Sequence, residues 1–548
     1  MKTVSGYVEN ITFRNEDNGF TVLTLSSGKE DITCTGNFGY IGQVEIEGEE
    51  VFHEIYGKQI KAINYKIVPA TDELSLKKYL GSGAIKGLGA VLADRIVDKF
   101  GEDTFRIIEE EPERLAEIRG ITTRKAMDIS TQLEEKKDMR DVMIFLQGYG
   151  ISPTLSTKIF NNYGTRVYDI IKTNPYQLAD DVTGIGFKTA DEIARRAGVE
   201  VNASVRIKSG MCYALTEASL SGHTYLPKEK MVETTINLLG LRDQYLNADG
   251  TYNMELLDNC FTELVLEKKL ILKEIDGNQA VFLSTFYYTE LNIARMLLEL
   301  NISTPEDDYI LGVKMDTVED MSGIHLDDLQ RQAVVATQNN GVSIITGGPG
   351  TGKTTTINAI IQLFESDGLE VSLAAPTGRA AKRMTEATGH EAKTIHRMLE
   401  ISGGQSDDPE LDAKFGRNEQ NPLETDVVIV DEMSMVDTFL MHAFLKAVTV
   451  GTRLVFVGDV NQLASVGPGN VLKDIIESEC FKVVRLTKVF RQAGESGIVT
   501  NAHKINEGKE VKLDNSFGDF LYIERENAQM ALNATIGLIK TKLPAYVG

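Results

Sequence analysis

The sequence has 548 residues, of which 42% are hydrophobic and 25% charged, and its formal net charge is −23. This composition excludes a disordered chain, and the length predicts about three or four domains. The negative charge weakens the case for a nucleic-acid partner without excluding it, because a local basic groove can bind phosphates on an acidic protein.

Cysteine usage and hydropathy predict a cytoplasmic protein with no membrane contact. No run of about 18 apolar residues could span a membrane, and residues 1–6 lead into an alternating pattern rather than a signal peptide. The cysteines are far apart and lack metal-ligand spacing, so we expect ordinary buried thiols in a reducing compartment at Cys34, Cys212, Cys260 and Cys480.

Residues 1–70 predict a small β domain. Short alternating runs at 4–8, 20–25 and 43–48 are separated by glycine-containing turns. Their close spacing predicts a five-stranded, OB-like barrel. Such a barrel would bind single strands or partners, or serve only as a structural cap, and the sequence favours neither.

Residues 71–200 contain an internal repeat. Four glycine-led turns, 33, 30 and 34 residues apart, each precede a helical pattern, and the glycines concerned are Gly87, Gly89, Gly120, Gly150, Gly184 and Gly186. These units resemble helix–hairpin–helix repeats, whose hairpin amides hold a DNA phosphate without reading sequence. Glycine permits the tight turn, and amides at a helix start attract an anion. The alternative is a set of plain joints inside an α-helical domain.

Residues 201–305 predict a mainly helical connector. Periodic runs at 205–220, 228–239 and 254–268 precede a hairpin signal around Asp276-Gly277-Asn278. Three helices and a hairpin resemble a winged helix, but a connecting domain without DNA contact fits equally well.

A phosphate loop begins the ATPase region, residues 306–500. A β-branched run at 342–346 precedes the pattern G-x-x-x-x-G-K-T, and a helical pattern follows. Lys353 is expected to reach the β- and γ-phosphates, and Thr354 to ligate Mg²⁺. The residues expected to bind the triphosphate are Gly347, Gly348, Pro349, Gly350, Thr351, Gly352, Lys353, Thr354 and Thr355.

The remaining core pattern predicts an α/β domain with a parallel sheet. Apolar strands at 370–375, 426–430, 453–457 and 483–486 each end in polar residues, where open α/β sheets bind ligands. Asp431 is expected to hold Mg²⁺ through water. Glu432 is expected to orient or deprotonate the attacking water.

Five motifs resemble those of superfamily-one helicases: 326–334 the adenine-reading Q motif, 375–381 motif Ia, 431–435 motif II, 458–463 motif III and 486–492 motif IV. The resemblance implies that Gln330 reads adenine, so that the nucleotide is ATP. It also implies that Gln462 senses the γ-phosphate and that Arg491 touches it.

Residues 394–399 and 436–437, together with the repeats and the β domain, make the whole chain similar to the long, free-standing RecD-like DNA helicases of bacteria. That resemblance implies ATP-driven 5′→3′ translocation on single-stranded DNA and unwinding at single-strand/duplex junctions, in DNA repair or recombination. A monomer is expected.

DNA contacts are expected in and after motif Ia, at Thr377, Arg379, Arg383 and His396. With Lys382, Lys393 and Arg397 they form a basic stretch suited to backbone phosphates, although a solvated helix face would have the same composition. In such helicases, residues 401–424 would be the small insertion that forms a strand-separating pin.

The sequence departs from the family after Gln492. Motifs V and VI of the second motor domain are not found, and residues 501–548 would only begin that domain. We therefore expect nucleotide binding, weak hydrolysis and little processive unwinding from the chain as it stands, whether it is a fragment or a truncated product. Two functions stay open: a DNA helicase, or a DNA-binding module whose ATPase is a switch or inert.

Overall fold

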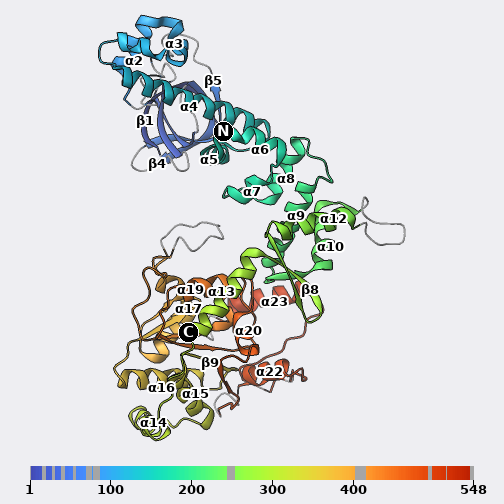
Figure 1. Ribbon diagram of the computed structural model, residues 1–548. Coiled ribbons are helices and arrows are strands. Elements are labelled where there is room, and N and C mark those ends of the chain that lie inside the picture. The colour runs from blue at the N-terminus through green and yellow to red at the C-terminus, as the bar shows by residue number, and fades with distance from the viewer. Residues whose placement is uncertain are drawn as a thin grey trace. The chain divides into compact units, whose positions relative to one another are not determined.

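The computed structural model describes residues 2–14, 20–26, 31–38, 43–53, 57–68, 77, 80, 85, 87–242, 254–401, 415–490, 496–513, 515–516 and 518–543. The chain forms two compact units, one of Met1–Tyr213 with Thr235–Cys260 and the other of Ala214–Thr234 with Phe261–Gly548 (Figure 1). The predicted connector, 201–305, contributes to both units, and the predicted domain limits stay a prediction. No helix in the described ranges is long and apolar enough to cross a membrane.

The first unit begins with a closed five-stranded barrel, as predicted. The strand order is β1-β2-β3-β5-β4, with β1 (Lys2–Arg14), β2 (Phe20–Ser26), β3 (Asp31–Asn37), β4 (Gln43–His53) and β5 (Gly57–Val68). Alternation along the strands turns Val4, Val8, Leu23 and Leu25 inward, and closure leaves no unpaired edge.

The barrel core also buries Cys34 and Met143, the latter from the long helix α4 (Thr123–Gly148), which lies against the barrel in Figure 1. Burial raises the pKa of Cys34 to about 12, so this thiol is inert, as expected. Of the four thiols expected to be buried, Cys34 and Cys260 are buried and Cys212 is half-buried, and the expectation is wrong for Cys480. It is exposed because it lies in the turn before a strand of the second unit.

The repeat region is helical, and each hairpin glycine precedes a helix as predicted. Gly87, Gly120, Gly150 and Gly184 have φ values of 83, 104, 79 and 97°, a conformation that favours glycine. The helices and 3₁₀ turns besides α4 are α2 (Ala90–Phe100), η1 (Gly101–Asp103), α3 (Thr104–Glu110), η2 (Pro112–Glu117), α5 (Pro153–Tyr163), η3 (Gly164–Arg166), α6 (Val167–Thr173), α7 (Gln177–Asp181) and α8 (Phe187–Arg196).

The connector has the predicted three helices and hairpin. A three-stranded sheet of order β6-β8-β7 belongs to the second unit. The elements are α9 (Ser204–Ser219), β6 (Tyr225–Pro227), α10 (Lys228–Leu239), α12 (Glu255–Leu266), β7 (Leu270–Ile275), β8 (Asn278–Leu283) and α13 (Ser284–Leu300).

A six-stranded parallel sheet forms the centre of the second unit, with the order β11-β10-β12-β13-β9-β14. Its strands are β9 (Val342–Gly347), β10 (Val371–Ala375), β11 (Ala392–Thr394), β12 (Val427–Val430), β13 (Arg453–Gly458) and β14 (Lys482–Leu486). Both faces are covered, as expected for parallel strands. Ile344 belongs to one core and its neighbour Ile345 to the other.

Helices from both cores cover the sheet. The core containing Ile345 includes α14 (Asp308–Ser322), α15 (Asp328–Asn339), α16 (Lys353–Ser366) and α17 (Gly378–Thr388). The core containing Ile344 includes α13, α18 (Ile395–Met398), η5 (Met433–Met435), α19 (Thr438–Lys446) and α20 (Val471–Glu477). Two further helices follow the sheet, α22 (Gly497–Asn506) and α23 (Ala528–Thr541).

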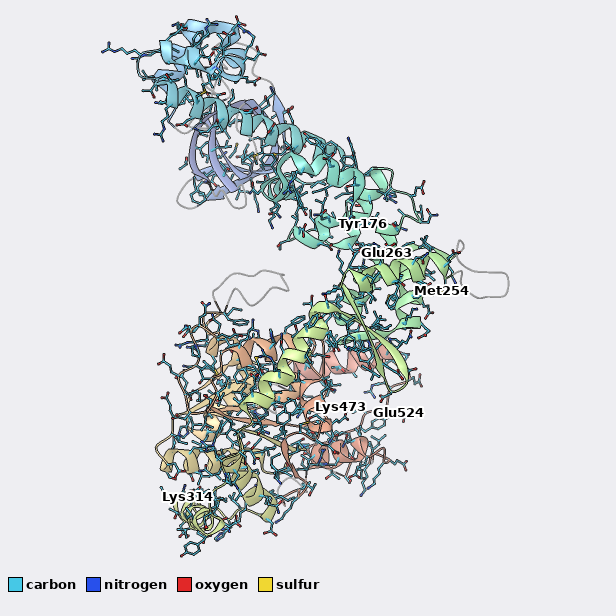
Figure 2. The ribbon with its side chains drawn as sticks, in the orientation of Figure 1. Tyr176, Met254, Glu263, Lys314, Lys473 and Glu524 are labelled. Atoms are coloured by element: carbon cyan, nitrogen blue, oxygen red, sulfur yellow. The ribbon has the colours of Figure 1, made fainter. Side chains whose placement is uncertain are left out.

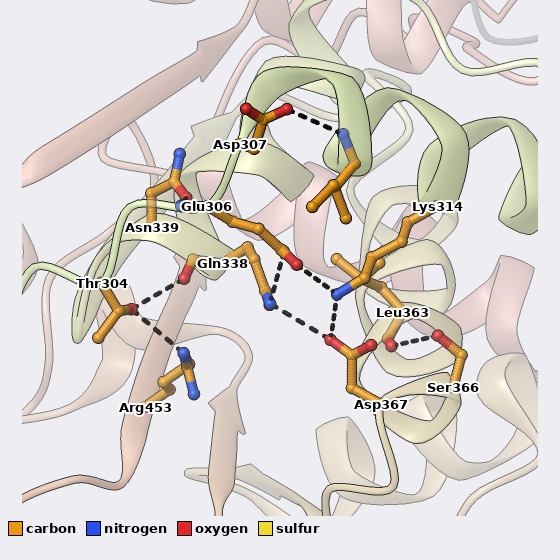
Figure 3. Close-up of polar contacts among 11 residues, drawn as sticks. Thr304, Glu306, Asp307, Lys314, Gln338, Asn339, Leu363, Ser366, Asp367 and Arg453 are labelled. Carbon is orange, nitrogen blue, oxygen red and sulfur yellow. Dashed lines mark hydrogen bonds and ion pairs between the residues drawn. The ribbon is translucent and has the colours of Figure 1, made fainter.

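A polar cluster joins α14 to the helix that follows the phosphate loop (Figure 3). The Lys314 ammonium lies 2.8 Å from a Glu306 oxygen and 2.9 Å from an Asp367 oxygen. The Gln338 amide donates to the same two carboxylates at 3.1 and 3.3 Å. Because all four groups share partners, the cluster fixes α14 against the ends of α15 and α16.

Glu319, 8% exposed, joins α14 to α15. Its Oε1 accepts a 2.7 Å bond from Arg331 Nε and a 3.2 Å bond from the amide of Leu326. The Arg331 bond is the main reason that the pKa of Glu319 falls to about 2.

Glu319→Gln should lower the free energy of unfolding of this unit by about 1.5–3 kcal/mol at pH 7, the range for hydrogen bonds to charged groups. The pKa of Glu319 in the folded protein lies below its ordinary value of 4.5, so the wild-type advantage is present above pH 4.5 and is lost as pH falls toward about 2. Denaturant unfolding at pH 7 and pH 3 measures this, with exposed Asp320→Asn as the matched control. An equal deficit at both values would contradict the assignment.

Candidate nucleotide and DNA site

The phosphate loop joins β9 to α16, and protein groups hold its backbone carbonyls. Lys353 Nζ donates to Gly347 O at 2.6 Å and to Gly348 O at 3.1 Å. Further bonds come from Thr351 Oγ1 to Gly348 O (2.9 Å), from the Phe490 amide to Gly350 O (3.1 Å) and from Gln330 Nε2 to Gly352 O (3.2 Å). Because protein groups bond these carbonyls, the N–H groups of the loop stay available to bind an anion. The N-terminus of α16 adds a field that favours negative charge at the same place.

The loop forms one wall of a cleft of about 790 Å³, within the usual range for small-molecule sites. The cleft brings together the predicted loop residues from Gly348 to Thr355, but not Gly347, with Asp431, Glu432 and Gln462. Thr377, Arg379 and Arg383, expected to contact DNA, also line this cleft. These three residues therefore lie where a triphosphate would fit, and their role in DNA binding stays a prediction.

Asp431 and Glu432 follow the buried strand β12. Asp431 Oδ1 accepts the Glu432 amide at 2.8 Å. Burial raises the pKa of Asp431, and this amide, Lys353 and Arg383 oppose the rise. A cation in the cleft would favour the charged form in the same way.

Glu432 has the left-handed backbone conformation, with φ of 55°, which costs a non-glycine residue about 1–3 kcal/mol. Its Oε2 is buried and has no hydrogen-bond partner among the described residues. Strain together with an unpaired buried carboxylate oxygen is typical of a functional site rather than a structural one.

Gln330 lies at the edge of this site and is 2% exposed. Its Oε1 accepts the Asp327 amide at 3.0 Å in a capping box for α15, and its Nε2 bonds Gly352 O. Reading adenine would require the amide to exchange one of these bonds. Arg491 lies outside the described residues.

Of the residues expected to contact DNA in and after motif Ia, Thr377 also has a structural bond, and His396 does not line the cleft. Thr377 caps α17 by accepting the Ala380 amide at 3.2 Å. The His396 ring lies 6.2 Å from the Phe415 ring, centroid to centroid. Of the predicted pin, 402–414 lie outside the described residues, and isolated bridges join Ile401 to Phe415 and Asn418 to Asn421.

The hairpins of the repeat region lie against each other in pairs. Arg95, after the first hairpin, donates to Arg119 O in the second at 3.0 Å. Lys158, after the third, donates to Thr183 O in the fourth at 3.1 Å, and Arg196, after the fourth, donates to Tyr149 O in the third at 2.6 Å. Cations thus lie beside these turns, but phosphate binding by the hairpin glycines stays a prediction.

Two contacts of the phosphate loop were not anticipated from the sequence. Phe490 belongs to motif IV, and its amide bonds Gly350 O. His503 of α22 places Nε2 3.3 Å from Pro349 O. No motif marks His503, and only its helix, shortly after motif IV, could have drawn attention to it.

Comparison with known proteins agrees with this arrangement. Residues 1–69 match the OB-fold domain of ATP-dependent DNA helicase YrrC, 135–225 the HHH domain of ATP-dependent RecD2 DNA helicases, and 325–517 an AAA domain. Over 523 residues the chain is 29% identical to the ATP-dependent RecD2 DNA helicase of Deinococcus radiodurans, covering 92% of this chain and 70% of that protein. The chain belongs to the RecD2-like ATP-dependent DNA helicases. The predicted family and fold class are therefore confirmed.

Other proteins similar to this RecD2-like chain match a smaller part of it. The RecBCD enzyme subunit RecD of Mycolicibacterium smegmatis is 38% identical over 190 residues, which are 30% of this chain and 33% of that protein. The match to the crystal structure of Pif1 helicase from Candida albicans covers 39% of this chain and 55% of the Pif1 chain, at 26% sequence identity and a TM-score of 0.28.

Proposed function

We propose that this RecD2-like chain binds and hydrolyses ATP to move 5′→3′ along single-stranded DNA and to open duplexes during DNA repair or recombination. The observation that carries the proposal is the cleft in which Lys353, Asp431, Glu432 and Gln462 meet beside the phosphate loop. The OB and helix–hairpin–helix regions support DNA as the partner. Direction and cellular role rest on kinship.

The residues of the cleft suit phosphoryl transfer to water. Lys353 Nζ donates to the carbonyls of Gly347 and Gly348, and it would exchange these bonds for bonds to the β- and γ-phosphates when ATP binds. The Thr354 hydroxyl and the Asp431 carboxylate are oxygen donors of the kind that Mg²⁺ prefers, and both line the cleft. When bound, Mg²⁺ would neutralise phosphate charge. Glu432 would use its unpaired Oε2 to accept a hydrogen bond from the attacking water.

A DNA-binding module with a nucleotide switch is the second candidate function. It is supported by α23, none of whose side chains is buried although it carries five apolar residues that are 39–54% exposed.

Strand displacement separates the two functions. On a 5′-tailed fork we expect ATP-dependent unwinding that Lys353→Ala abolishes, with a 3′-tailed fork remaining closed. Lys473→Ala, on the half-exposed face of α20, is the matched control and should unwind normally. Unwinding that survives Lys353→Ala would contradict the motor proposal. DNA binding that responds to ATP without any unwinding would instead favour the switch.

A further inference from the structure

The helix α22 contacts the phosphate loop through His503. Its Nε2 lies 3.3 Å from Pro349 O. The ring also packs so closely against Gly348 that a Cβ at that position would lie 2.6 Å from His503 Cε1. Glycine at 348 therefore lets the imidazole lie directly on the backbone of the loop.

The contact with His503 is one of several in which a protein group lies against a backbone carbonyl of the phosphate loop. Gly350 O is bonded by the Phe490 amide and Gly352 O by Gln330, while Pro349 O, immediately before Gly350, faces His503. Phe490 and His503 both come from the chain that follows β14. Since the loop's amides can hold phosphates only while its peptide planes keep their orientation, each holder should contribute to nucleotide affinity.

The helix itself is fixed from its other side. Asn501, 1% exposed, donates Nδ2 to Lys512 O at 3.4 Å and accepts the Lys512 amide at 3.3 Å. The amide of Gly497, at the start of α22, donates to Asp519 Oδ1 at 2.8 Å. A displacement of Lys512 and Asp519 would therefore displace α22 and, with it, His503.

We propose that His503 is a positioning residue for the phosphate loop, which holds Pro349 O from α22 and so couples nucleotide affinity to the position of that helix. The inference rests on the proposed function, in which this loop binds ATP. His503 acts through the loop and is not assigned a contact with the nucleotide.

Two substitutions separate hydrogen bonding from packing. His503→Leu fills much of the space and removes the donor, whereas His503→Gln keeps an N–H close to the position of Nε2. With the full chain and a fluorescent ATP analogue, we expect His503→Leu to weaken binding about 2- to 10-fold, the range for one neutral hydrogen bond. His503→Gln should stay within about twofold of wild type. In steady-state hydrolysis, KM should rise more than kcat falls.

Ile505→Ala, at a position 65% exposed on the same helix, is the matched control and should bind as wild type does. Circular dichroism melting confirms that each variant is folded. Wild-type affinity in His503→Leu, or equal weakening in folded His503→Leu and His503→Gln, would overturn the inference. If Lys353→Ala abolishes binding while His503→Leu does not, only this inference fails. If Lys353→Ala still binds ATP normally, the proposed function fails.

Discussion

Glu432→Gln should leave ATP binding intact while hydrolysis falls by about 10²- to 10⁴-fold, the usual contribution of a general base. Glutamine has nearly the same size, so the left-handed turn at position 432 and the buried packing of the side chain are retained. It has no carboxylate to accept a proton from water. The separation of binding from turnover is therefore the signature expected of Glu432.

The measurement is a single-turnover hydrolysis experiment at saturating ATP, with affinity determined separately by titration of a fluorescent analogue. Glu424→Gln is the matched control, because its side chain is 91% exposed and outside the cleft. Its hydrolysis should equal that of wild type. Loss of binding together with hydrolysis in Glu432→Gln would show that this residue shapes the site rather than assisting the attack by water.

Local patterns in the sequence were enough to predict the architecture. Period-two alternation at 4–8 and 20–25 identifies barrel strands because one face of each is buried. The continuous apolar run at 427–430 identifies the strand that presents Asp431. The phosphate loop was equally accessible, since its glycines and Lys353 are adjacent in sequence.

Features that depend on tertiary packing could not be predicted. Arg379 and Arg383 lie on a helix whose basic face suits DNA, and only the placement of α17 beside the phosphate loop brings them to the nucleotide cleft. The motif predicts that Gln330 reads adenine, but it does not predict the two bonds that its side-chain amide makes. The oxygen accepts the Asp327 amide in the capping box, and the nitrogen donates to Gly352 O. The exposure of Cys480 likewise follows from the turn in which it lies rather than from residue type.

A half-buried ion pair in the first unit, whose Arg206 and Asp191 side chains are 14% and 27% exposed, should contribute strongly to stability. Arg206, on α9, donates Nε and Nη2 to the two oxygens of Asp191 at 2.8 and 3.0 Å, and Nη1 to Val201 O and Leu239 O at 3.0 and 3.1 Å. Tyr176, labelled in Figure 2 and 2% exposed, donates to Asp191 at 2.6 Å. Burial raises the pKa of Asp191, but the bonds from Arg206 and Tyr176 outweigh it, so the pKa is lowered.

Arg206→Leu should destabilise the helices around α8 and α9 by about 1.5–3 kcal/mol, because it leaves a half-buried carboxylate and two carbonyls without their partner. Hydrogen exchange in the full chain, followed at the amides of α8 and of the part of α9 up to Tyr213, measures this unit separately from the other. Arg195→Leu is the matched control, since that side chain is 77% exposed, and it should change protection little.

The double variant Asp191→Leu/Arg206→Leu should recover part of the loss, because it removes the uncompensated charge as well as its partner. A double variant less stable than Arg206→Leu alone would mean that Asp191 has a role beyond balancing this arginine. Unchanged protection in Arg206→Leu would show that the ion pair does not hold α8 to α9. The lowered pKa of Asp191 also predicts how the effect depends on pH. The stability that the Asp191 carboxylate contributes is present above the pKa of the unfolded state and declines as the carboxyl is protonated. The stability deficit of Arg206→Leu should therefore shrink at acidic pH.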